Sequence, residues 1–316
     1  MFAVLIDQFW ALTIAGLALG FIYVLISLGY TMVYGVLRMI NFANSEIFMV
    51  GTFATVIVIR DVFKFTQSSE YATGPRLWFI LVTALVISML VSGLLSLVVE
   101  LVAYRRLRRR NSGILAPLIS AIGVSMVLAE SVRIMTDSRP VAAPRAMDKT
   151  FIGQFFDAGI RLDNTIIVIA ALVLFIALTT FINKTRMGKA IRAVSMNPNA
   201  ARLMGINIDG VISATFLIGG LMTGAAGFFY VLKYENTASN IGFELGIAAF
   251  TAAILGGIGN IKGAFFGGLT LGLLETYASF YLGTQWKAVT VFIVLVLVLY
   301  TRPNGIFGES MTQSRV

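Results

Sequence analysis

"RMINFANSEIFMVG" occupies residues 38–51 and follows directly on an apolar run that is long enough to cross a membrane. It carries five side chains that the hydrocarbon core disfavours, namely Arg38, Asn41, Asn44, Ser45 and Glu46. The apolar pattern then resumes and continues to about residue 63. Polar groups are tolerated at membrane depth only where they face protein or a water-filled cavity. The stretch is therefore either a short cytoplasmic turn or a helix break that lines a pathway through the membrane.

Outside this stretch the composition is that of an integral membrane protein. Of the 316 residues, 58% are hydrophobic and 12% are charged, against about 25% charged in soluble domains, and the mean hydropathy is +0.89. The pattern predicts an all-α, polytopic membrane helix bundle that forms a single domain over residues 1–316. It has about nine transmembrane segments, between eight and ten, and some of them are broken or re-entrant. These segments are expected at roughly 10–30, 46–63, 77–103, 113–135, 164–183, 210–232, 243–258, 263–282 and 286–301.

Basic residues mark which loops face the cytoplasm. Residues 104–110, "YRRLRRR", carry five arginines, and residues 183–205 carry five Lys or Arg with no acidic residue. The positive-inside rule places both loops in the cytoplasm, and the number of later crossings returns the C-terminus there as well. The same rule accounts for the net charge of +9, so the chain is not expected to bind nucleic acid.

The first apolar run extends to Leu37 and is longer than one crossing requires. Either it crosses once as a tilted helix, or it breaks near Gly29 or Gly35. The N-terminus lies outside the cell in the first case and inside it in the second.

Several kinds of chemistry are excluded by composition. The chain has no cysteine and no histidine, which excludes disulfides, thiol catalysis, zinc and haem sites and histidine acid–base work. We expect no catalytic residue and no metal site. The glycine-rich stretch at 256–263 fits neither a Walker A loop nor a dinucleotide fingerprint, because no Gly-Lys-Ser/Thr follows and Ile261 occupies the last glycine position. It is interpreted as a tight turn between helices, and the chain is not expected to hydrolyse ATP.

A cytoplasmic segment at about 184–208 has more local order than a tether requires. Thr185 can cap a short helix that contains Arg192, and Asn197-Pro198 is typical of an N-cap followed by proline at the first helical position. Gly205 is a plausible left-handed residue after the second helix. The remaining candidate residues of this second helix are Ala200, Leu203 and Met204. The segment is either an ordinary basic loop or a docking element for a cytoplasmic partner.

Glu275 is the one acidic residue that lies well inside a predicted span. It should face the interior of the bundle, where it either lines a conduit or is satisfied by a neighbouring hydroxyl. The other ionisable residues near the spans are expected to snorkel or face water at the ends. These are Glu100, Glu130, Lys233, Glu235 and Lys287.

Several long motifs resemble the branched-chain amino acid ABC transporter permeases, and particularly the first, shorter permease of the pair. The motifs occur in order along nearly the whole chain, at 25–51, 117–126, 186–207, 249–275 and 302–308. The resemblance implies a bacterial inner-membrane permease subunit that forms the substrate pathway with a second, homologous permease. Two cytoplasmic ATPases would carry the ATP and Mg, with no cofactor in this chain, and an external binding protein would deliver leucine, isoleucine or valine. In this resemblance 184–208 matches the region that couples to the ATPases.

The opening stretch departs from that family's usual pattern. Family members commonly have Asn-Phe-Ala-His-Gly-Glu, whereas this chain has Asn44-Ser45 in place of His-Gly, and Arg38 stands where a small residue is usual. We expect Asn44 or Ser45 to cap a helix that begins near Glu46, and Arg38 to pair with the Glu46 carboxylate. Candidate residues of the substrate pathway are thus Asn41, Asn44, Ser45, Glu46 and Glu275.

The sequence leaves three alternatives to this interpretation. Permeases of the same type that carry urea or amides also resemble the chain. A self-contained secondary transporter would need an intramembrane carboxylate relay, for which Glu275 alone is thin support. A membrane-embedded enzyme is disfavoured by the missing histidine and cysteine.

Overall fold

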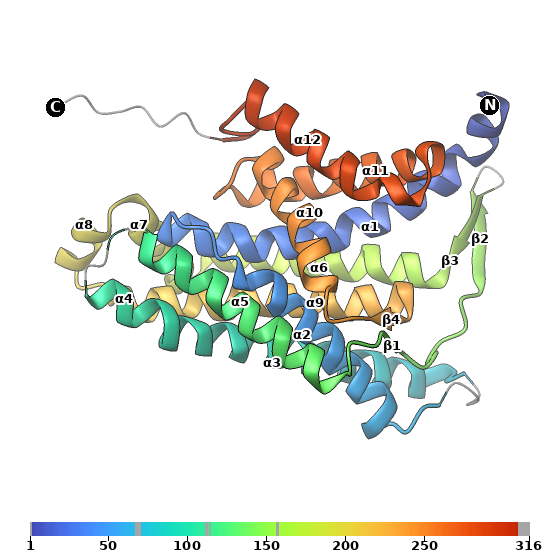
Figure 1. Ribbon diagram of the computed structural model, residues 1–316, viewed down its shortest axis with the longest axis horizontal. Helices are drawn as coiled ribbons and strands as arrows, with labels where there is room; N and C mark the ends of the chain where they lie inside the picture. Colours follow the sequence, from blue (N-terminus) through green and yellow to red (C-terminus); the bar gives the residue numbers. More distant parts are fainter. Residues whose placement is uncertain (1, 67–70, 111–112, 114, 156–157, 309–316) are drawn as a thin grey trace.

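The computed structural model describes residues 2–66, 71–110, 113, 115–155 and 158–308, and helices dominate it (Figure 1). The helices are α1 (Phe2–Leu37), α2 (Ala43–Ile57), α3 (Gly74–Val99), α4 (Arg105–Arg109), α5 (Leu115–Met135), α6 (Leu162–Lys184), α7 (Arg186–Met196), α8 (Pro198–Leu203), α9 (Ile208–Tyr234), α10 (Ile241–Gly256), α11 (Ile261–Leu282) and α12 (Lys287–Thr301). Single π-helical turns extend α2 over Val58–Val62 and α3 over Glu100–Tyr104. The predicted helical bundle is confirmed, with a small addition of strand.

The strands are short and pair in two antiparallel ribbons. They are β1 (Val141–Ala142), β2 (Phe151–Phe155), β3 (Ala158–Arg161) and β4 (Asn236–Thr237). Strand β1 pairs with β4, and β2 pairs with β3. All four lie at the end of the molecule where α1 begins, which is called the strand end below (Figure 1).

Six helical segments in the described residues are long and apolar enough to cross a membrane. They are Gln8–Leu37, Gly74–Arg109, Leu115–Met135, Leu162–Lys184, Ile208–Tyr234 and Thr284–Thr301. The predicted number of about nine segments is not confirmed by this criterion. Two of the expected crossings correspond to α2 and α10, which have 15 and 16 residues. At about 1.5 Å per residue these helices are shorter than the ~30 Å hydrocarbon core.

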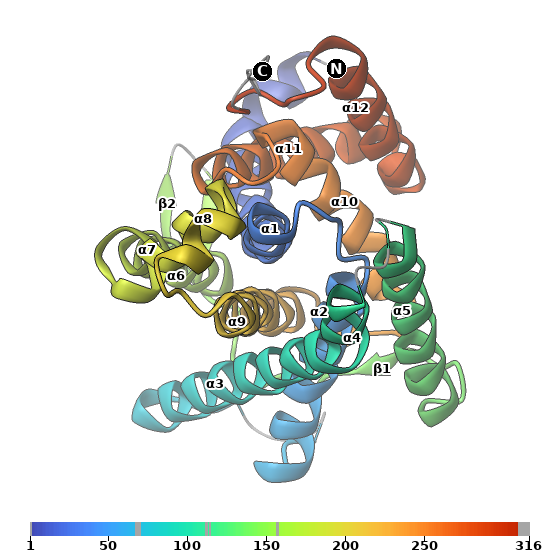
Figure 2. The same cartoon turned by 90° about the vertical axis from the view of Figure 1, so that its left-hand side faces the viewer.

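Helix α1 is continuous through Gly29 and Gly35, so the alternative in which the first run breaks is wrong. It runs through the centre of the molecule with α2, α6, α9, α10 and α11 around it (Figure 2). Gly29 is a contact position, because a Cβ added there would lie 2.2 Å from the Thr223 hydroxyl of α9. Gly20 and Gly272 likewise let the backbones of α1 and α11 approach, with a Cβ on Gly272 only 2.3 Å from Gly20. Small residues thus determine the packing around α1.

Helices α2 and α10 begin within the bundle and run in opposite directions. The chain turns back after α1 and runs beside it before α2 begins (Figure 1). Along α10, Gly242 lies against Glu46, Gly246 against Ser45, and the Phe250 ring 6.1 Å from the Phe42 ring. As residue numbers increase along α10, the numbers of the residues it contacts at the start of α2 decrease. The two helices are therefore antiparallel, and their first turns lie side by side.

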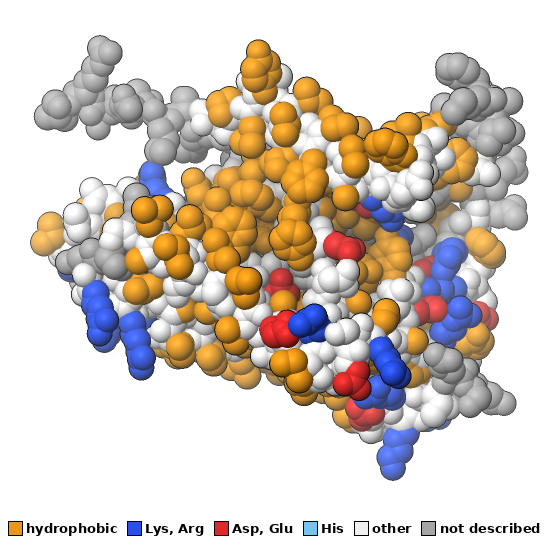
Figure 3. All heavy atoms as spheres, in the orientation of Figure 1, with side chains coloured by type: hydrophobic (Ala, Val, Ile, Leu, Met, Phe, Trp, Pro, Cys, Tyr) orange, Lys and Arg blue, Asp and Glu red, His pale blue; other side chains and the backbone are white. Residues whose placement is uncertain are grey.

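The two ends of the molecule differ in charge. Helices α4, α7 and α8 lie together at the end opposite the strands, which is called the basic end below (Figure 1). The segment after α12 returns to the same end as the close of α10, since the Ile306 amide donates to the Leu255 carbonyl at 2.9 Å. Between the ends, the visible face is covered largely by apolar side chains, as Figure 3 shows. This distribution is typical of a protein that spans a membrane.

Glu100 lies in the core at the basic end rather than in water, so the expectation that it snorkels is wrong. Its side chain is fully buried, and its carboxylate oxygens lie 3.0 Å from Arg105 and 3.2 Å from Arg108. The Ser213 hydroxyl of α9 donates to the same carboxylate at 2.9 Å. The cluster joins the end of α3 to α9, because a buried carboxylate persists only when charged or hydrogen-bonding partners surround it.

At the strand end, Glu235 links the 136–161 loop to the end of α9 through ion pairs and a backbone hydrogen bond. Its carboxylate forms ion pairs with Arg145 at 2.7 Å and Lys149 at 2.6 Å, and its carbonyl accepts the Ala143 amide at 2.8 Å. Burial alone raises the pKa of Glu235, but the ion pairs with Lys149 and Arg145 outweigh it and hold the pKa below its ordinary value. A carboxyl whose pKa falls on folding stabilises the fold above its unfolded pKa, about 4.3 for Glu, and loses that contribution as the pH falls through the folded value.

Glu235→Gln is expected to loosen this loop at neutral pH. The lost interaction is about 1 kcal/mol, so amide protection of 141–149 in hydrogen exchange should fall roughly fivefold at pH 7. Near pH 3 the wild-type protein should approach the variant, because its own carboxylate becomes protonated. Glu130→Gln, which removes an exposed pair with Arg133 on α5, is the matched control and should change nothing. Equal protection of Glu235→Gln and wild type at pH 7 would contradict the assignment.

Candidate functional site

The turn that starts α2 is built by Asn41. Its side-chain Oδ1 accepts the Ala43 amide at 3.1 Å and the Tyr104 hydroxyl at 3.0 Å, and its carbonyl accepts the Asn44 amide at 3.1 Å. Helix α2 therefore begins at Ala43 without a side-chain cap on Phe42. The prediction that Asn44 or Ser45 caps a helix starting near Glu46 is wrong, because the helix has already begun when the chain reaches them.

Asn44 joins three helices instead of capping one. Its side chain is buried, and it accepts the Thr223 hydroxyl of α9 at 3.1 Å. Its amide nitrogen donates to the Ile26 carbonyl of α1 at 3.4 Å. Both partners lie near the middle of long membrane-spanning helices, so Asn44 marks the depth at which α2 begins. A polar side chain at this depth is retained only because protein groups satisfy it.

Glu46 lies in the first turn of α2 with 2% of its surface exposed. Its Oε1 lies 3.4 Å from the hydroxyls of Ser45 and of Ser125 on α5. Within the described residues its Oε2 has no hydrogen-bond partner. The positive end of the α2 dipole favours the carboxylate by about 0.3–1 kcal/mol, which is small against the cost of burying it. The Oε2 oxygen can therefore accept a hydrogen bond that the described residues do not supply.

Arg38 does not form the expected pair with Glu46. Its guanidinium donates to the Ser195 carbonyl of α7 at 3.3 Å, which ties the end of α1 to the basic end. Its backbone φ is +53°, in the left-handed region. Glycine adopts that conformation at lower cost than arginine, so the end of α1 carries a local backbone cost at Arg38.

Two glycines of α10 shape the wall opposite Glu46. A Cβ on Gly242 would lie 2.5 Å from Glu46 Oε2, and one on Gly246 would lie 2.4 Å from the Ser45 Cβ. Any larger residue at these positions would displace the polar start of α2. The first turns of α2 and α10 thus form one site, which contains Asn41, Asn44, Ser45 and Glu46.

Glu275 belongs to a separate site nearer the strand end. It is 4% exposed, as expected for a residue facing the bundle interior. It accepts the Tyr23 hydroxyl of α1 at 2.6 Å, and Lys287 at the start of α12 lies 3.8 Å away. Tyr30, seven residues after Tyr23 on α1, lies beside Gly246 at the first site. The two sites are therefore separated by about 10 Å along the axis of α1. The sequence grouped Glu275 with 41–46, and the structure separates them along α1.

Helices α7 and α8 occupy the segment predicted at about 184–208, and the predicted caps at Thr185 and Asn197 are confirmed. Thr185 Oγ1 accepts the Gly188 amide at 3.0 Å, and Asn197 Oδ1 accepts the amides of Asn199 and Ala200 at 3.0 and 3.1 Å. Pro198 occupies the first turn of α8. Gly205, which follows α8, has φ +78°.

The apolar side chains of this segment divide into a packed set and an exposed set. Ile191, Val194 and Ala201 are buried against the bundle. Leu203 and Met204 are 88% and 83% exposed. Arg192 lies at the base of the segment, where its guanidinium reaches the Asn183 carbonyl at 3.5 Å, and Ala200 is exposed. The exposed pair at the end of α8 is a surface on which an apolar partner can dock.

The residues that complete these sites gave no local signal in the sequence. The partners missed were Tyr23, Tyr104, Ser125, Thr223, Gly242, Gly246 and Lys287. Most of them lie far along the chain from the residue they contact, as with Asn44 and Thr223, which are 179 positions apart, whereas Lys287 is 12 positions from Glu275. The packing of α1, α5, α9, α10 and the end of α3 around α2 brings the first site together, and the packing of α1 and α12 against α11 brings together the second.

Comparison with known proteins gives concordant matches over most of the chain. The family described as "branched-chain amino acid transport system / permease component" matches residues 12–299. The chain is 40% identical to the high-affinity branched-chain amino acid transport system permease protein LivH of Escherichia coli (strain K12), over 93% of this chain and 94% of that protein. It is 39% identical to the corresponding protein BraD of Pseudomonas aeruginosa, with the same coverage. Among solved structures, PsaBC from Streptococcus pneumoniae in complex with Fab aligns over 96% of this chain and 97% of that chain, with a TM-score of 0.48 and 13% identity.

Proposed function

Because the chain belongs to the branched-chain amino acid transport system permease family, we propose that it is the subunit of an ATP-driven importer through which branched-chain amino acids cross the membrane. The observation that carries this is the 40% identity to LivH over 93% of the chain. The buried polar start of α2 is consistent with a pathway at membrane depth. Urea or amide transport and an independent secondary transporter are not favoured by these relatives.

We further propose that nine helices lie in the bacterial inner membrane. They are α1, α2, α3, α5, α6, α9, α10, α11 and α12, with α2 and α10 entering from within the bundle. In this arrangement the basic end lies in the cytoplasm together with the C-terminal segment, and the clustered Arg and Lys residues support this orientation. The start of α1 and the strand end then face the outside, where an external binding protein delivers the amino acid.

Energy is supplied by partner subunits in this proposal. Two cytoplasmic ATPases bind ATP and Mg, and one of them docks on α7 and α8 of this chain through the exposed Leu203 and Met204. A second, homologous permease completes the pathway. This chain has no Gly-Lys-Ser/Thr phosphate loop and serves as the transport subunit rather than as an enzyme.

The polar start of α2 suits an amino-acid substrate. The unpartnered Glu46 Oε2 can accept a hydrogen bond from the substrate's ammonium group. Asn41 Nδ2, which also has no partner within the described residues, can donate to its carboxylate. Short helices that begin at membrane depth are used in this way by other transporters.

State-dependent labelling tests this placement, and the cysteine-free chain makes the experiment clean. Ser45→Cys changes only oxygen to sulfur, and we expect its thiol to react several-fold faster with a small aqueous thiol reagent in one nucleotide state of the assembled importer than in another. Ser239→Cys, in the loop before α10, is the matched control and should label equally in both states. A Ser45→Cys thiol whose labelling rate never changes with nucleotide would reduce residues 41–46 to a structural turn.

A further inference from the structure

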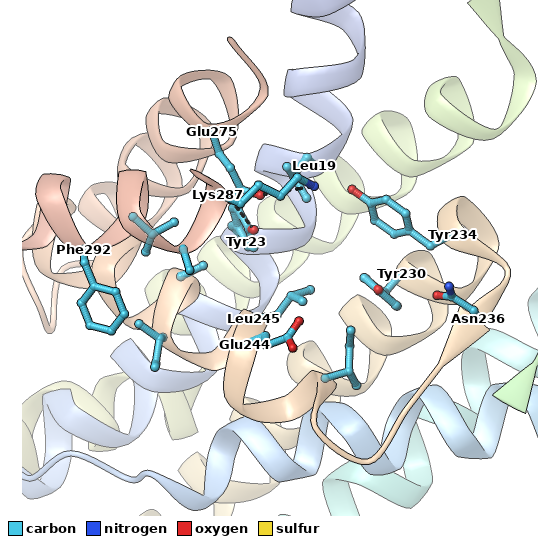
Figure 4. A pocket seen from close by; sticks show the side chains of 15 residues that line it. Leu19, Tyr23, Tyr230, Tyr234, Asn236, Glu244, Leu245, Glu275, Lys287 and Phe292 are labelled. Atoms are coloured by element: carbon cyan, nitrogen blue, oxygen red, sulfur yellow. Dashed lines mark hydrogen bonds and ion pairs between the residues drawn. The ribbon is translucent and has the colours of Figure 1, made fainter. Parts of the chain in front are cut away.

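Glu275 lines a cavity of about 410 Å³ near the strand end. Its lining comes from α1, α9, α10, α11 and α12, together with Asn236 of β4. Figure 4 shows Tyr23, Glu275 and Lys287 meeting on one side of it, with Tyr230 and Glu244 across from them. The volume lies within the range of about 300–1,000 Å³ that is usual for small-molecule sites.

Charges of both signs meet in this cavity. Lys287 lies 3.8 Å from Glu275, too far for a hydrogen bond, and among the residues that the structure describes its ammonium makes none. Glu275 uses one oxygen for the Tyr23 hydroxyl, which leaves the other facing Lys287 only at that long distance. Glu244 is a second carboxylate at the wall, held by Asn240 at 2.7 Å. The carboxylates of Glu275 and Glu244 and the ammonium of Lys287 can therefore each bind a further group.

The rest of the wall is apolar. Leu19, Leu245 and Val291 line the cavity and are buried, and the rings of Tyr230 and Tyr234 lie 4.7 Å apart beside them. A site of this composition matches a small molecule with an ammonium, a carboxylate and an aliphatic side chain. A purely apolar ligand would leave the second oxygen of the buried Glu275 without a close donor, which is costly.

We infer that this cavity binds the zwitterion of an aliphatic amino acid. The substrate ammonium is held by Glu275 and Glu244, its carboxylate by Lys287, and its side chain by the apolar wall. This inference rests on the proposed function, and it assigns a binding station apart from the start of α2.

The first turn of α10 separates this station from Glu46. Ile241 and Leu245 line the cavity, whereas Gly242, between them, lies against the Glu46 carboxylate. An amino acid in the cavity is therefore one helix width from the polar start of α2. The bound amino acid thus occupies the outer station, nearer the strand end. To reach the start of α2 it must pass the first turn of α10.

Substrate protection of a cysteine tests the station. Ala248 lines the cavity and is 3% exposed, so Ala248→Cys places a single thiol within it. In the assembled importer in lipid nanodiscs, saturating L-leucine should slow labelling by a small methanethiosulfonate at least about tenfold. Analogues that lack one charge, 4-methylpentanoate and 3-methylbutylamine, should need roughly tenfold higher concentrations for the same protection, because each loses a charged contact.

Two further variants test the charged groups directly. Glu275→Gln keeps a partner for Tyr23 while removing the charge, and Lys287→Met keeps an unbranched apolar side chain while removing the ammonium. In the Ala248→Cys background each should weaken leucine protection at least tenfold, while Ser239→Cys labelling outside the cavity stays indifferent to leucine. Ala288→Cys, on the part of the wall formed by α12, repeats the measurement.

The outcomes separate this inference from the proposed function. Wild-type transport of leucine with no leucine protection at either cysteine would overturn the station and leave the importer assignment intact. Equal protection by leucine and by both analogues would overturn it too, because the cavity would then recognise only apolar shape. Two cysteines that never label would show that no aqueous ligand enters. An assembled importer that binds and moves no branched-chain amino acid would instead overturn the proposed function.

Discussion

Replacing Leu203 and Met204 together by aspartate is expected to bring amino-acid transport to background while the permease still folds. Both side chains are more than four-fifths exposed, so the change removes no packing within this chain. If they fill apolar pockets on an ATPase, each contributes about 1.5–3 kcal/mol, and burying a charge in its place costs more. A total loss above about 4 kcal/mol corresponds to roughly a thousandfold weaker docking.

The measurement is co-purification of the ATPases with the permease, together with substrate-stimulated ATP hydrolysis in the assembled importer. Met135→Asp is a matched control, because Met135 is 84% exposed but lies at the far end of α5, and it should leave ATPase binding unchanged. If the double variant retains both ATPase binding and stimulation, the segment formed by α7 and α8 is not the docking element.

Glu46→Gln is expected to slow transport by at least tenfold without changing the amount of assembled importer. Glutamine preserves the shape of the side chain but replaces an acceptor oxygen by a donor and removes the charge. A hydrogen bond to a charged group contributes about 1.5–3 kcal/mol, so its loss at the substrate corresponds to roughly a 10- to 150-fold effect. Radiolabelled leucine uptake into proteoliposomes measures the rate.

Two comparisons make the Glu46 result specific. Glu46→Asp keeps the charge on a shorter side chain and should recover part of the rate. Glu130→Gln removes a carboxylate from the exposed face of α5, where it pairs with Arg133 at 2.7 Å, and should have little effect. Wild-type uptake by Glu46→Gln would show that the buried carboxylate serves packing rather than passage.

Local sequence was sufficient where the stabilising contacts are local. The caps at Thr185 and Asn197 bond amides no more than three residues away, so the residues themselves predict them. The same holds for Gly205, whose positive φ follows from its place after α8. At the start of α2 the same reasoning failed, because Asn41 holds the turn and Tyr104, from the end of α3, completes it.

The partners of buried charges required the whole fold. Glu100 looked like a residue at the end of a span, yet α9 and two arginines enclose it. Glu46 and Arg38 are eight residues apart and of opposite sign, but α7 takes the arginine and α5 supplies Ser125 to the carboxylate. The sign of a buried charge predicts which kind of partner it requires. Which group lies near enough to be that partner depends on tertiary packing.

By itself, the sequence determined that this protein is a helical membrane protein, which of its loops are basic and which family it belongs to. Hydrophobic runs and clustered Lys and Arg fix the first two properties through each residue's own transfer energy, whatever its neighbours are, and the ordered motifs fix the family. The tertiary structure alone decided that α2 and α10 begin within the bundle, that Gly242 and Gly246 shape the wall at Glu46, and that Glu275 shares a cavity with Lys287. These features depend on how closely helices distant in sequence approach, and that distance is set by the packing of the entire bundle.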